Sequence, residues 1–228
     1  MGKKKHDVTM IGDEFPSIHV HTTHGKRNLP DDYQGSWFVL FSHPGDFTPV
    51  CTTEFMTFER NHRRFKALNC ELIGLSIDTV FSHMKWLEWV REHFGVTISF
   101  PVIADELGKV SKQLGMIAPK AGTRAVRTVY IVDHEGTVRL IMNYPAEVGR
   151  NIEEILRAVY ALQTADFNKA ATPADWPRNE YIGDQLILPP PTDLFAAQKR
   201  IEEANVKGYS CLDWWFCYRP FQRKDGES

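Results

Sequence analysis

Hydrophobic positions along the chain follow two different periods, and the change from one to the other marks the expected elements. Residues 8–41 read as strands and turns. Short apolar runs rich in β-branched and aromatic residues favour buried strands at 36–41, 71–77, 99–104 and 128–132, the last followed by a turn at 133–136 and a hairpin partner at 137–142. Apolar residues at helical spacing predict helices at 49–68, 81–94, 106–114, 151–162 and 192–205. Strands that alternate with helices indicate an α/β fold in which helices flank a mixed sheet.

The predicted helix 81–94 carries a row of large apolar side chains at mixed helical spacing. We expect this row to pack in the hydrophobic core rather than to bind a cofactor. Its members are Phe81, Met84, Trp86, Leu87, Val90 and Phe94.

The composition changes after about residue 166, so we expect a first domain at 1–166 and a C-terminal extension at 167–228. The prolines at 173, 177 and 189–191 indicate an extended arm rather than a second compact core. The chain then reaches a segment dense in aromatic residues, 211–218. A patch this apolar usually marks an interface, so we expect a partner subunit to cover it.

Composition and charge argue against several classes of function. The 228 residues are 43% hydrophobic and 25% charged with a formal net charge of −2, which indicates a globular protein and no nucleic-acid partner. We expect the short basic run at 3–5 to be a solvated start of the chain. No apolar stretch reaches the roughly 18 residues of a membrane helix, and none follows the lysines as a secretory signal would. We therefore expect a cytoplasmic protein without a membrane partner.

The sequence contains four cysteines: Cys51, Cys70, Cys211 and Cys217. In a chain expected in the cytosol, cysteines are catalytic, redox-active or metal-binding more often than they are structural bridges. The sequence has no C-x-x-C pair, which argues against a zinc ribbon and against a thioredoxin-type dithiol motif.

Three histidines, His19, His21 and His24, look like metal ligands at first sight. Their alternation fits one face of a strand near a turn, and no acidic or thiol residue stands at ligand spacing from them. We therefore expect no metal site.

Cys51 stands at the position with the strongest chemical signal. The apolar run 36–41 precedes it, Pro44 breaks that run, Thr48 is a good N-cap residue, and Pro49 suits the first position of a helix. Cys51 is then third in the helix, where backbone N–H groups lack partners and a negative charge gains about 0.3–1 kcal/mol. Since the thiolate is the nucleophilic form, a nearby cation would complete an activated site. Without such a cation, Cys51 would be an ordinary small buried residue.

The segment His43–Glu54 resembles the active-site signature of the peroxiredoxins, the alkyl hydroperoxide reductase/thiol-specific antioxidant family. The segment 127–133 resembles the strand that carries the arginine of that site. Residues 144–151 and 175–177 resemble the subfamily with a long C-terminal domain, and the spacing of Cys211 and Cys217 is similar to its archaeal branch. The resemblance implies a thioredoxin-like fold, an extension that reaches a neighbouring subunit, and dimers assembled into a decamer.

This resemblance implies a thiol peroxidase that reduces hydrogen peroxide and organic hydroperoxides without a cofactor. Cys51 would become a sulfenic acid. Cys217 of a neighbouring subunit would then resolve it through an intersubunit Cys51–Cys217 disulfide, which a thioredoxin-like or glutaredoxin-like dithiol would reduce. Cys211 is the other candidate for the resolving thiol, with Cys211–Cys217 as an alternate pair. The alternative is that both are buried packing cysteines among the tryptophans, and we expect Cys70 to be inert.

The resemblance also implies roles for residues around the thiol. Arg127 would hold the Cys51 thiolate and bind the peroxide, because a guanidinium is permanently charged and offers several donors. Thr48 would cap the helix by accepting a backbone N–H and donate its hydroxyl to sulfur or peroxide, or would serve only as a cap. Pro44 would shield the thiolate from water, or simply break the strand. His43 would line the pocket or act in acid–base chemistry.

Two further charged residues complete the implied site. Glu54 lies three positions after Cys51 on the same helical face, so it would orient Arg127 through a bidentate pair or remain a solvated acid. Arg150 resembles a second arginine near the site.

Other functions compete with this hypothesis. The dense aromatic segment also suits an oligomeric holdase chaperone or a peroxide sensor. A thioredoxin-like core suits a general disulfide oxidoreductase, which the lack of C-x-x-C disfavours. Some peroxiredoxins are linked to a lipase-like Gly-x-Ser-x-Gly motif, but the segment 34–38 does not match it.

Overall fold

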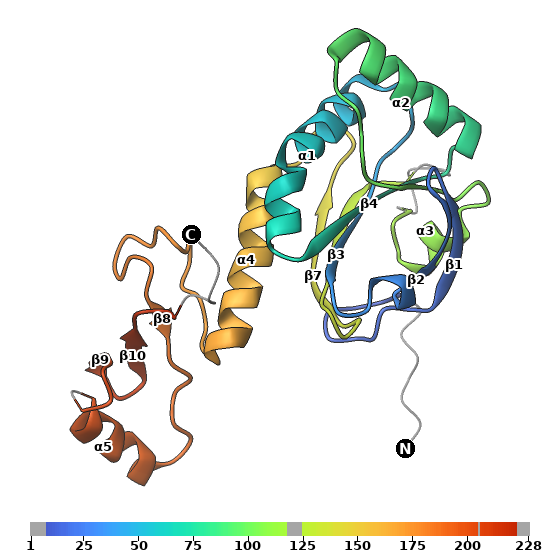
Figure 1. Cartoon of the computed structure of the whole chain (residues 1–228). Helices are drawn as coiled ribbons and strands as arrows, with labels where there is room; N and C mark the ends of the chain where they lie inside the picture. The colour runs from blue at the N-terminus through green and yellow to red at the C-terminus, as the bar shows by residue number, and fades with distance from the viewer. Residues whose placement is uncertain (1–7, 118–124, 205, 223–228) are drawn as a thin grey trace, which may run out of the picture. The chain divides into compact units, whose positions relative to one another are not determined.

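The computed structural model describes residues 8–117, 125–204 and 206–222. These residues form two compact units, which divide between Leu156 and Arg157 and are described separately below (Figure 1). The basic run at 3–5 lies outside the described residues. Among the described helices, none combines the length and apolar character needed to cross a bilayer.

A sheet of seven strands forms the centre of the first unit, in the order β2-β1-β5-β4-β3-β6-β7. Strands β3, β4 and β5 run parallel, and the other neighbours pair antiparallel. The sheet is therefore mixed, which confirms the predicted α/β fold class. The strands are β1 (Ile18–Thr22), β2 (Gly25–Leu29), β3 (Trp37–Ser42), β4 (Cys70–Ser76), β5 (Val102–Ala104), β6 (Arg127–Val132) and β7 (Val138–Tyr144).

The helices of this unit begin and end close to the predicted positions. Helix α1 starts at the predicted proline, and α2 ends at a glycine in the left-handed region, Gly95 with φ 67°. Such a residue closes a helix because glycine has no Cβ to clash. The elements are the short 3-10 helix η1 (Asp31–Tyr33), α1 (Pro49–Ala67), α2 (Val80–Phe94), α3 (Lys109–Gln113) and the start of α4 (Ile152–Asn168).

Alternate side chains of β3 supply two separate cores, because successive residues of a strand point to opposite faces. Phe38 and Leu40 belong to the cluster on one face. On the other face, Phe41 stacks on Phe58 of α1 with ring centroids 4.0 Å apart and meets Phe55 edge-on at 5.3 Å. Burial of each such side chain contributes about 1.5–3 kcal/mol. This packing fixes α1, and with it the start of the helix, against the end of β3 (Figure 1).

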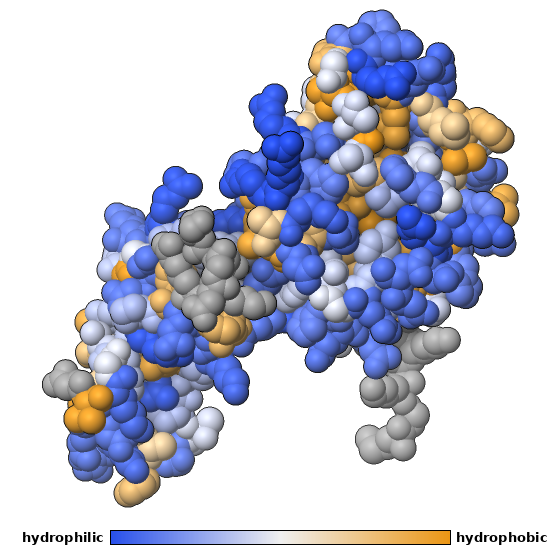
Figure 2. Space-filling model, in the orientation of Figure 1, coloured by the Kyte–Doolittle hydropathy of each residue, from blue (hydrophilic) through white to orange (hydrophobic). Residues whose placement is uncertain are grey.

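The expectation that the whole apolar row of α2 lies in the core is wrong. Trp86 and Val90 are fully buried, but Phe81, Met84 and Phe94 are 78%, 55% and 53% exposed. The row has mixed spacing, so its members spread over more of the helix surface than the sheet can cover. Figure 2 shows hydrophobic side chains at the surface of the region that α2 occupies in Figure 1.

The second unit has a small core of its own, where the proline content predicted only an extended arm. Trp176 is fully buried and clusters with Ala161, Ala170 and Leu186. Its indole N–H donates to the carbonyl of Asp184 at 2.7 Å, so the polar end of this large ring is also satisfied. One aromatic residue thereby organises a segment in which proline restricts regular structure.

The same unit carries a three-stranded sheet in the order β8-β10-β9. Its elements are the rest of α4, β8 (Leu186–Ile187), α5 (Leu194–Glu203), β9 (Ser210–Asp213) and β10 (Phe216–Arg219). Helix α5 lies within the predicted range 192–205, whose last residue is outside the described residues. Trp214 and Trp215, in the turn between β9 and β10, are 39% and 53% exposed.

Candidate active site around Cys51

The start of α1 places Cys51 as the sequence predicts. Thr48 is the N-cap with extended backbone angles, Pro49 is the first helical residue, and Cys51 is the third. The predicted capping bond is absent: the Thr48 hydroxyl makes no bond to a helical N–H and donates instead to the carbonyl of Gly45 at 2.8 Å. The hydroxyl turns back into the loop before the helix, so the N–H groups of the first turn keep their unpaired character near the sulfur.

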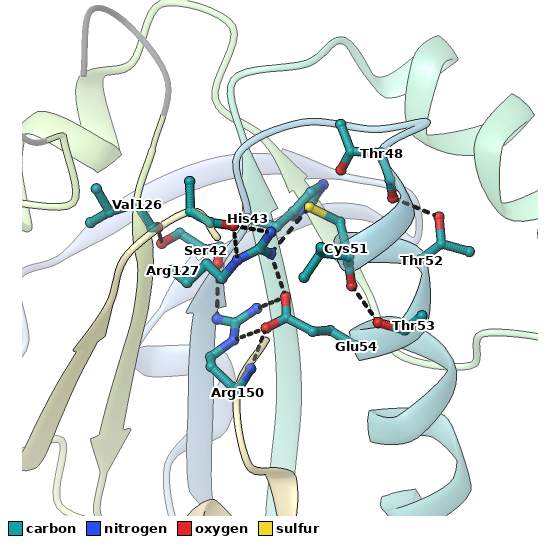
Figure 3. A network of polar contacts seen from close by, with 12 residues as sticks. Ser42, His43, Thr48, Cys51, Thr52, Thr53, Glu54, Val126, Arg127 and Arg150 are labelled. Atoms are coloured by element: carbon teal, nitrogen blue, oxygen red, sulfur yellow. Dashed lines mark hydrogen bonds and ion pairs between the residues drawn. The ribbon is translucent and has the colours of Figure 1, made fainter. Parts of the chain in front are cut away.

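The Cys51 thiol is fully buried and faces a guanidinium (Figure 3). Nη1 of Arg127 lies 3.3 Å from the Cys51 sulfur. Arg127 starts β6, the strand that pairs with β3, and its Nε and Nη2 donate to the carbonyl of Ala146 at 3.1 and 2.8 Å. The guanidinium therefore has a fixed orientation, with one of its nitrogens directed at the sulfur.

Glu54 lies between two guanidiniums (Figure 3). One carboxylate oxygen accepts from Arg127 Nη1 and from Arg150 Nη2, each at 2.7 Å. The other accepts from Nε and the backbone N–H of Arg150, at 2.9 and 2.8 Å. Glu54 is 3% exposed, so this is a buried ion triad rather than the solvated acid that was the alternative expectation.

Arg150 holds this triad to the sheet. Its Nη1 donates to the carbonyls of Ser42 at 2.9 Å and Thr128 at 3.2 Å, and its guanidinium lies over the ring of Phe41 at 5.1 Å. These contacts tie Arg150 to β3 and β6 at the points where each approaches Cys51. The sequence placed Arg150 near the site, but its bond to Ser42 depends on strand pairing that the sequence does not display.

The buried triad shifts the pKa values of Glu54 and Arg150. Burial raises the pKa of the Glu54 carboxyl, but the attraction and hydrogen bonds of Arg150, with a smaller effect from Arg127, outweigh burial and hold that pKa below its ordinary value. Burial lowers the pKa of Arg150, and the charge of Glu54 opposes this change. Glu54 is thus an anion that neutralises one of the two arginines.

His43 is fully buried behind this site. One of its ring nitrogens is bonded to Asp46 and is therefore not free for acid–base chemistry. Its Nε2 lies 3.0 Å from an oxygen of Asp46. Burial lowers the pKa of His43, against the opposing effect of Asp46. Burial raises the pKa of Asp46, but the hydrogen bonds from His43 and His83 lower that pKa by more. The net pKa of Asp46 is therefore well below its usual range. Pro44 and Thr48, the other loop residues expected at the site, are half-buried.

The sequence did not identify Asp46 and His83 as residues near the site. His83 is fully buried on α2, and its Nδ1 lies 2.8 and 3.0 Å from the two oxygens of Asp46. The available signal was a histidine one helical turn before the core residue Trp86, because a histidine on a buried helix face needs polar partners.

The cluster of His43, Asp46 and His83 also has the composition of a metal site, with ligand atoms within 4.8 Å of one another. The separations of 2.8–3.0 Å from Asp46 are those of hydrogen bonds, which account for these atoms without an ion. The three histidines considered from sequence do not gather: His19 and His21 take exposed positions of β1 and His24 follows in the turn.

The four cysteines occupy three different environments. Cys51 and Cys70 are free and buried, and Cys211 and Cys217 form a disulfide between β9 and β10. Burial raises the pKa of the Cys70 thiol far above its ordinary value, as does the nearby charge of Glu71. Cys217 is fully buried and Cys211 is half-buried, so one sulfur of the pair is closer to solvent.

Comparisons with known proteins match both units. The AhpC/TSA family model matches residues 11–141, and the model of the C-terminal domain of 1-Cys peroxiredoxin matches residues 161–204. A peroxiredoxin of Thermotoga maritima is 59% identical over 212 residues, 93% of this chain and 97% of the relative. A peroxiredoxin of Archaeoglobus fulgidus is 56% identical over 210 residues, 92% of this chain and 98% of the relative.

Solved structures agree with the sequence relatives. A yeast mitochondrial 1-Cys peroxiredoxin, described by its thiol resolving mechanism via glutathione/thioredoxin systems, has a TM-score of 0.81 and 33% identity over 94% of this chain and 100% of its own. A mutant of peroxiredoxin 6 from Arenicola marina has a TM-score of 0.80 and 34% identity over 94% of this chain and 99% of its own.

Proposed function

Because the chain belongs to the peroxiredoxins, thiol peroxidases that reduce peroxides, we propose that Cys51 is the thiol that the peroxide oxidises. The observation that carries this proposal is the 3.3 Å contact between its buried sulfur and Arg127 Nη1. Cys70 is the other free cysteine, but its surroundings favour the protonated thiol. A reactive thiolate needs a cation, and among the free cysteines only Cys51 makes such a bond in the described residues.

Charge balance supports a thiolate at Cys51. The buried group contains two guanidiniums and one carboxylate, which leaves one positive charge in excess when the sulfur is protonated. A Cys51 thiolate removes this excess. Unbalanced charge is costly where water is excluded, so the site favours the anionic sulfur.

The chemistry follows from this arrangement. The thiolate attacks one peroxide oxygen, the S–O bond forms as the O–O bond breaks, and the departing oxygen takes a proton to leave as water or an alcohol. Arg127 is placed to stabilise the negative charge that moves along the oxygens. The Thr48 hydroxyl, which donates to the carbonyl of Gly45 in the structure, would donate to the bound peroxide instead. We also propose that Pro44 and His43 line the space that the peroxide enters.

A pair of matched variants tests the assignment. Cys51→Ser should abolish peroxide consumption, and Cys70→Ser, which alters the other free buried thiol, should leave it within about twofold of the wild type. Turnover that survives in Cys51→Ser but not in Cys70→Ser would reverse the assignment. The measurement is the consumption of hydrogen peroxide in the presence of dithiothreitol.

For the second half of the cycle we propose that Cys217 from another subunit attacks the Cys51 sulfenic acid, which forms a Cys51–Cys217 disulfide and releases water. The Cys211 thiolate then attacks the Cys217 sulfur, which forms the Cys211–Cys217 disulfide and releases the Cys51 thiolate. The disulfide between Cys211 and Cys217 supports an exchange between these two sulfurs. The half-buried Cys211 is the sulfur that a thioredoxin-like or glutaredoxin-like dithiol would attack. The balance is one peroxide reduced and one external dithiol oxidised.

Non-reducing electrophoresis after a single addition of peroxide tests this order. Cys211→Ser should accumulate a disulfide-linked dimer, because the bond between Cys51 and Cys217 cannot pass on. Cys217→Ser should give no such dimer. A dimer in Cys217→Ser that is lost in Cys211→Ser would exchange the two roles.

A peroxide-sensing or holdase role in a homo-oligomer, such as a decamer, is the second candidate. It is favoured by apolar side chains at the surface, with Leu212 75% and Phe81 78% exposed. A holdase should suppress the aggregation of a heated client protein equally well in the wild type and in Cys51→Ser. Loss of suppression in that variant would tie the effect to the peroxidase. We place this activity, like the reduction of peroxides, in the cytoplasm.

A further inference from the structure

Helix α2 contacts the chain on both sides of Cys51. His83 and Trp86 are one turn apart on its buried face, and both are fully buried. His83 binds Asp46, in the loop that leads into α1, and Trp86 binds Thr52, directly after Cys51. We therefore expect these two residues to affect the Cys51 sulfur through Asp46 and Thr52.

His83 fixes the loop before Cys51. Its Nδ1 lies 2.8 Å from Asp46 Oδ2, and its Nε2 lies 3.2 Å from the carbonyl of Ile103 on β5, which sets the orientation of the ring. The backbone N–H of Asp46 donates to Asp78 at 3.0 Å. The backbone and the side chain of Asp46 are therefore both held by groups outside its own loop.

The loop needs the bonds of Asp46 because the residue after Asp46, Phe47, has a strained backbone conformation. Phe47 has φ 55°, in the left-handed region that bulky residues rarely adopt. Its side chain is 57% exposed and has little packing to stabilise this conformation. The strain must be balanced by neighbouring interactions. Asp46 precedes Phe47 and Thr48 follows it, so the bonds of Asp46 determine where the N-cap of α1 lies.

Trp86 fixes the turn after Cys51. Its indole Nε1 donates to the hydroxyl of Thr52 at 3.2 Å, and that hydroxyl donates to the carbonyl of Thr48 at 2.9 Å. The indole also packs against Phe55, one turn further along α1, with ring centroids 4.7 Å apart. The first turn of α1 is thus joined to α2 through one shared hydroxyl group.

We propose that His83 and Trp86 are positioning residues for peroxide reduction, which hold the strained loop and the first turn of α1 so that the Cys51 sulfur stays aligned with Arg127. This inference rests on the proposed role of Cys51. A shift of the sulfur by a fraction of its 3.3 Å separation from Arg127 would weaken that contact, and rates depend steeply on such alignment.

The test compares three histidine variants by the second-order rate constant of Cys51 oxidation, measured per titrated Cys51 thiol. His83→Leu keeps the size but removes the bond to Asp46, and should slow oxidation by about tenfold or more. His83→Asn places an amide N–H where Nδ1 was, and should restore the rate to within about threefold. His93→Leu changes an exposed histidine of the same helix and should have no effect.

A second pair covers the case in which His83→Leu does not fold. Trp86→Phe keeps the aromatic packing, loses the N–H bond to Thr52, and should slow oxidation by about threefold to tenfold. Trp89→Phe makes the same change at a position that is 36% exposed and should leave the rate unchanged.

The results separate this proposal from the proposed function. If the wild type does not oxidise Cys51 with peroxide, the proposed function fails. If the wild type does so, two outcomes overturn the positioning role: His83→Leu within twofold of the wild type, or His83→Asn as slow as a folded His83→Leu. Where His83→Leu does not fold, equal rates for Trp86→Phe and Trp89→Phe overturn it.

Discussion

The two sulfur centres of this protein have opposite surroundings. Cys51 lies in a buried group of charges in which every guanidinium and carboxylate has a partner, and it remains a free thiol. Cys211 and Cys217 lie in a small hairpin beside two exposed tryptophans and are bonded to each other. The thiol is the same chemical group in each place, so its role is set by neighbouring charges in one unit and by a neighbouring thiol in the other.

The largest expected effect on the contrast between the two sulfur centres comes from removing the Glu54 carboxylate, which lies at the centre of the buried ion triad. Glu54→Gln removes the carboxylate that two buried guanidiniums share, and should reduce the free energy of unfolding of the first unit by about 3 kcal/mol at pH 7. Chemical denaturation followed by circular dichroism checks this value. Glu180→Gln, which removes an exposed carboxylate from the second unit and so changes the net charge by the same amount, is the control for net charge.

The pH dependence of the same variant has a definite sign. The folded pKa of Glu54 is depressed, so its stabilising effect is complete above the unfolded value of about 4.3 and declines as the pH falls from there towards the lower folded pKa. The difference in the free energy of unfolding between wild type and Glu54→Gln should therefore become smaller below pH 4. A difference that stays constant down to pH 3 would show that Glu54 acts by packing and not by charge.

The next effect concerns reactivity. Arg127→Gln should slow the alkylation of Cys51 by iodoacetamide at pH 7 by about 100-fold, equivalent to about 2.7 kcal/mol, because the cation at the sulfur is lost. Arg91→Gln, at an exposed position of α2, is the matched control. After reduction, Cys211 should be alkylated at the same rate in all three proteins. Faster alkylation of the buried Cys70 in Arg127→Gln would indicate general unfolding instead.

Reduction of the hairpin disulfide should have a smaller effect, confined to the second unit. The bond closes a loop with a sequence separation of 6, for which chain entropy predicts about 2 kcal/mol. Amide hydrogen exchange should become faster in β9 and β10 after treatment with dithiothreitol, while β3 and β6 stay unchanged. Faster exchange in β3 would show that the two centres are coupled.

The smallest effect is expected at the exposed end of the hairpin. Trp215→Ser removes a side chain that is 53% exposed and should change the stability of the second unit by less than about 0.5 kcal/mol. Hydrogen exchange of β10 measures this change. A cost above 1 kcal/mol would reveal that the indole is buried by another subunit in solution.

Local features of the sequence predicted the fold and the position of Cys51 well. The proline at the start of α1 and the apolar run of β3 lie next to each other in the chain, so their consequences can be worked out from a few residues. These elements depend on backbone preferences that act over one or two turns.

Features that depend on distant partners could not be predicted in this way. The bond of Asp46 to His83 joins a loop to a helix 37 residues later, and the sequence gives only a histidine on an apolar face. The hydroxyl of Thr48 bonds its own loop rather than the helix, because the strained Phe47 backbone turns it there. The exposure of Phe81 depends on how much of α2 the sheet can cover.

The pairing of β3 with β6 also determines which mutations the proposed activity can tolerate. Phe41 lies opposite Val129, and Arg127 lies two residues earlier, on the same face as Val129. A slip of one residue along this ladder would turn the guanidinium to the far side of the sheet while most backbone hydrogen bonds could form again. Single-residue insertions in β6 should therefore be far more damaging to the proposed catalysis than to folding. The register between β3 and β6 is then as necessary to the proposed active site as its side chains are.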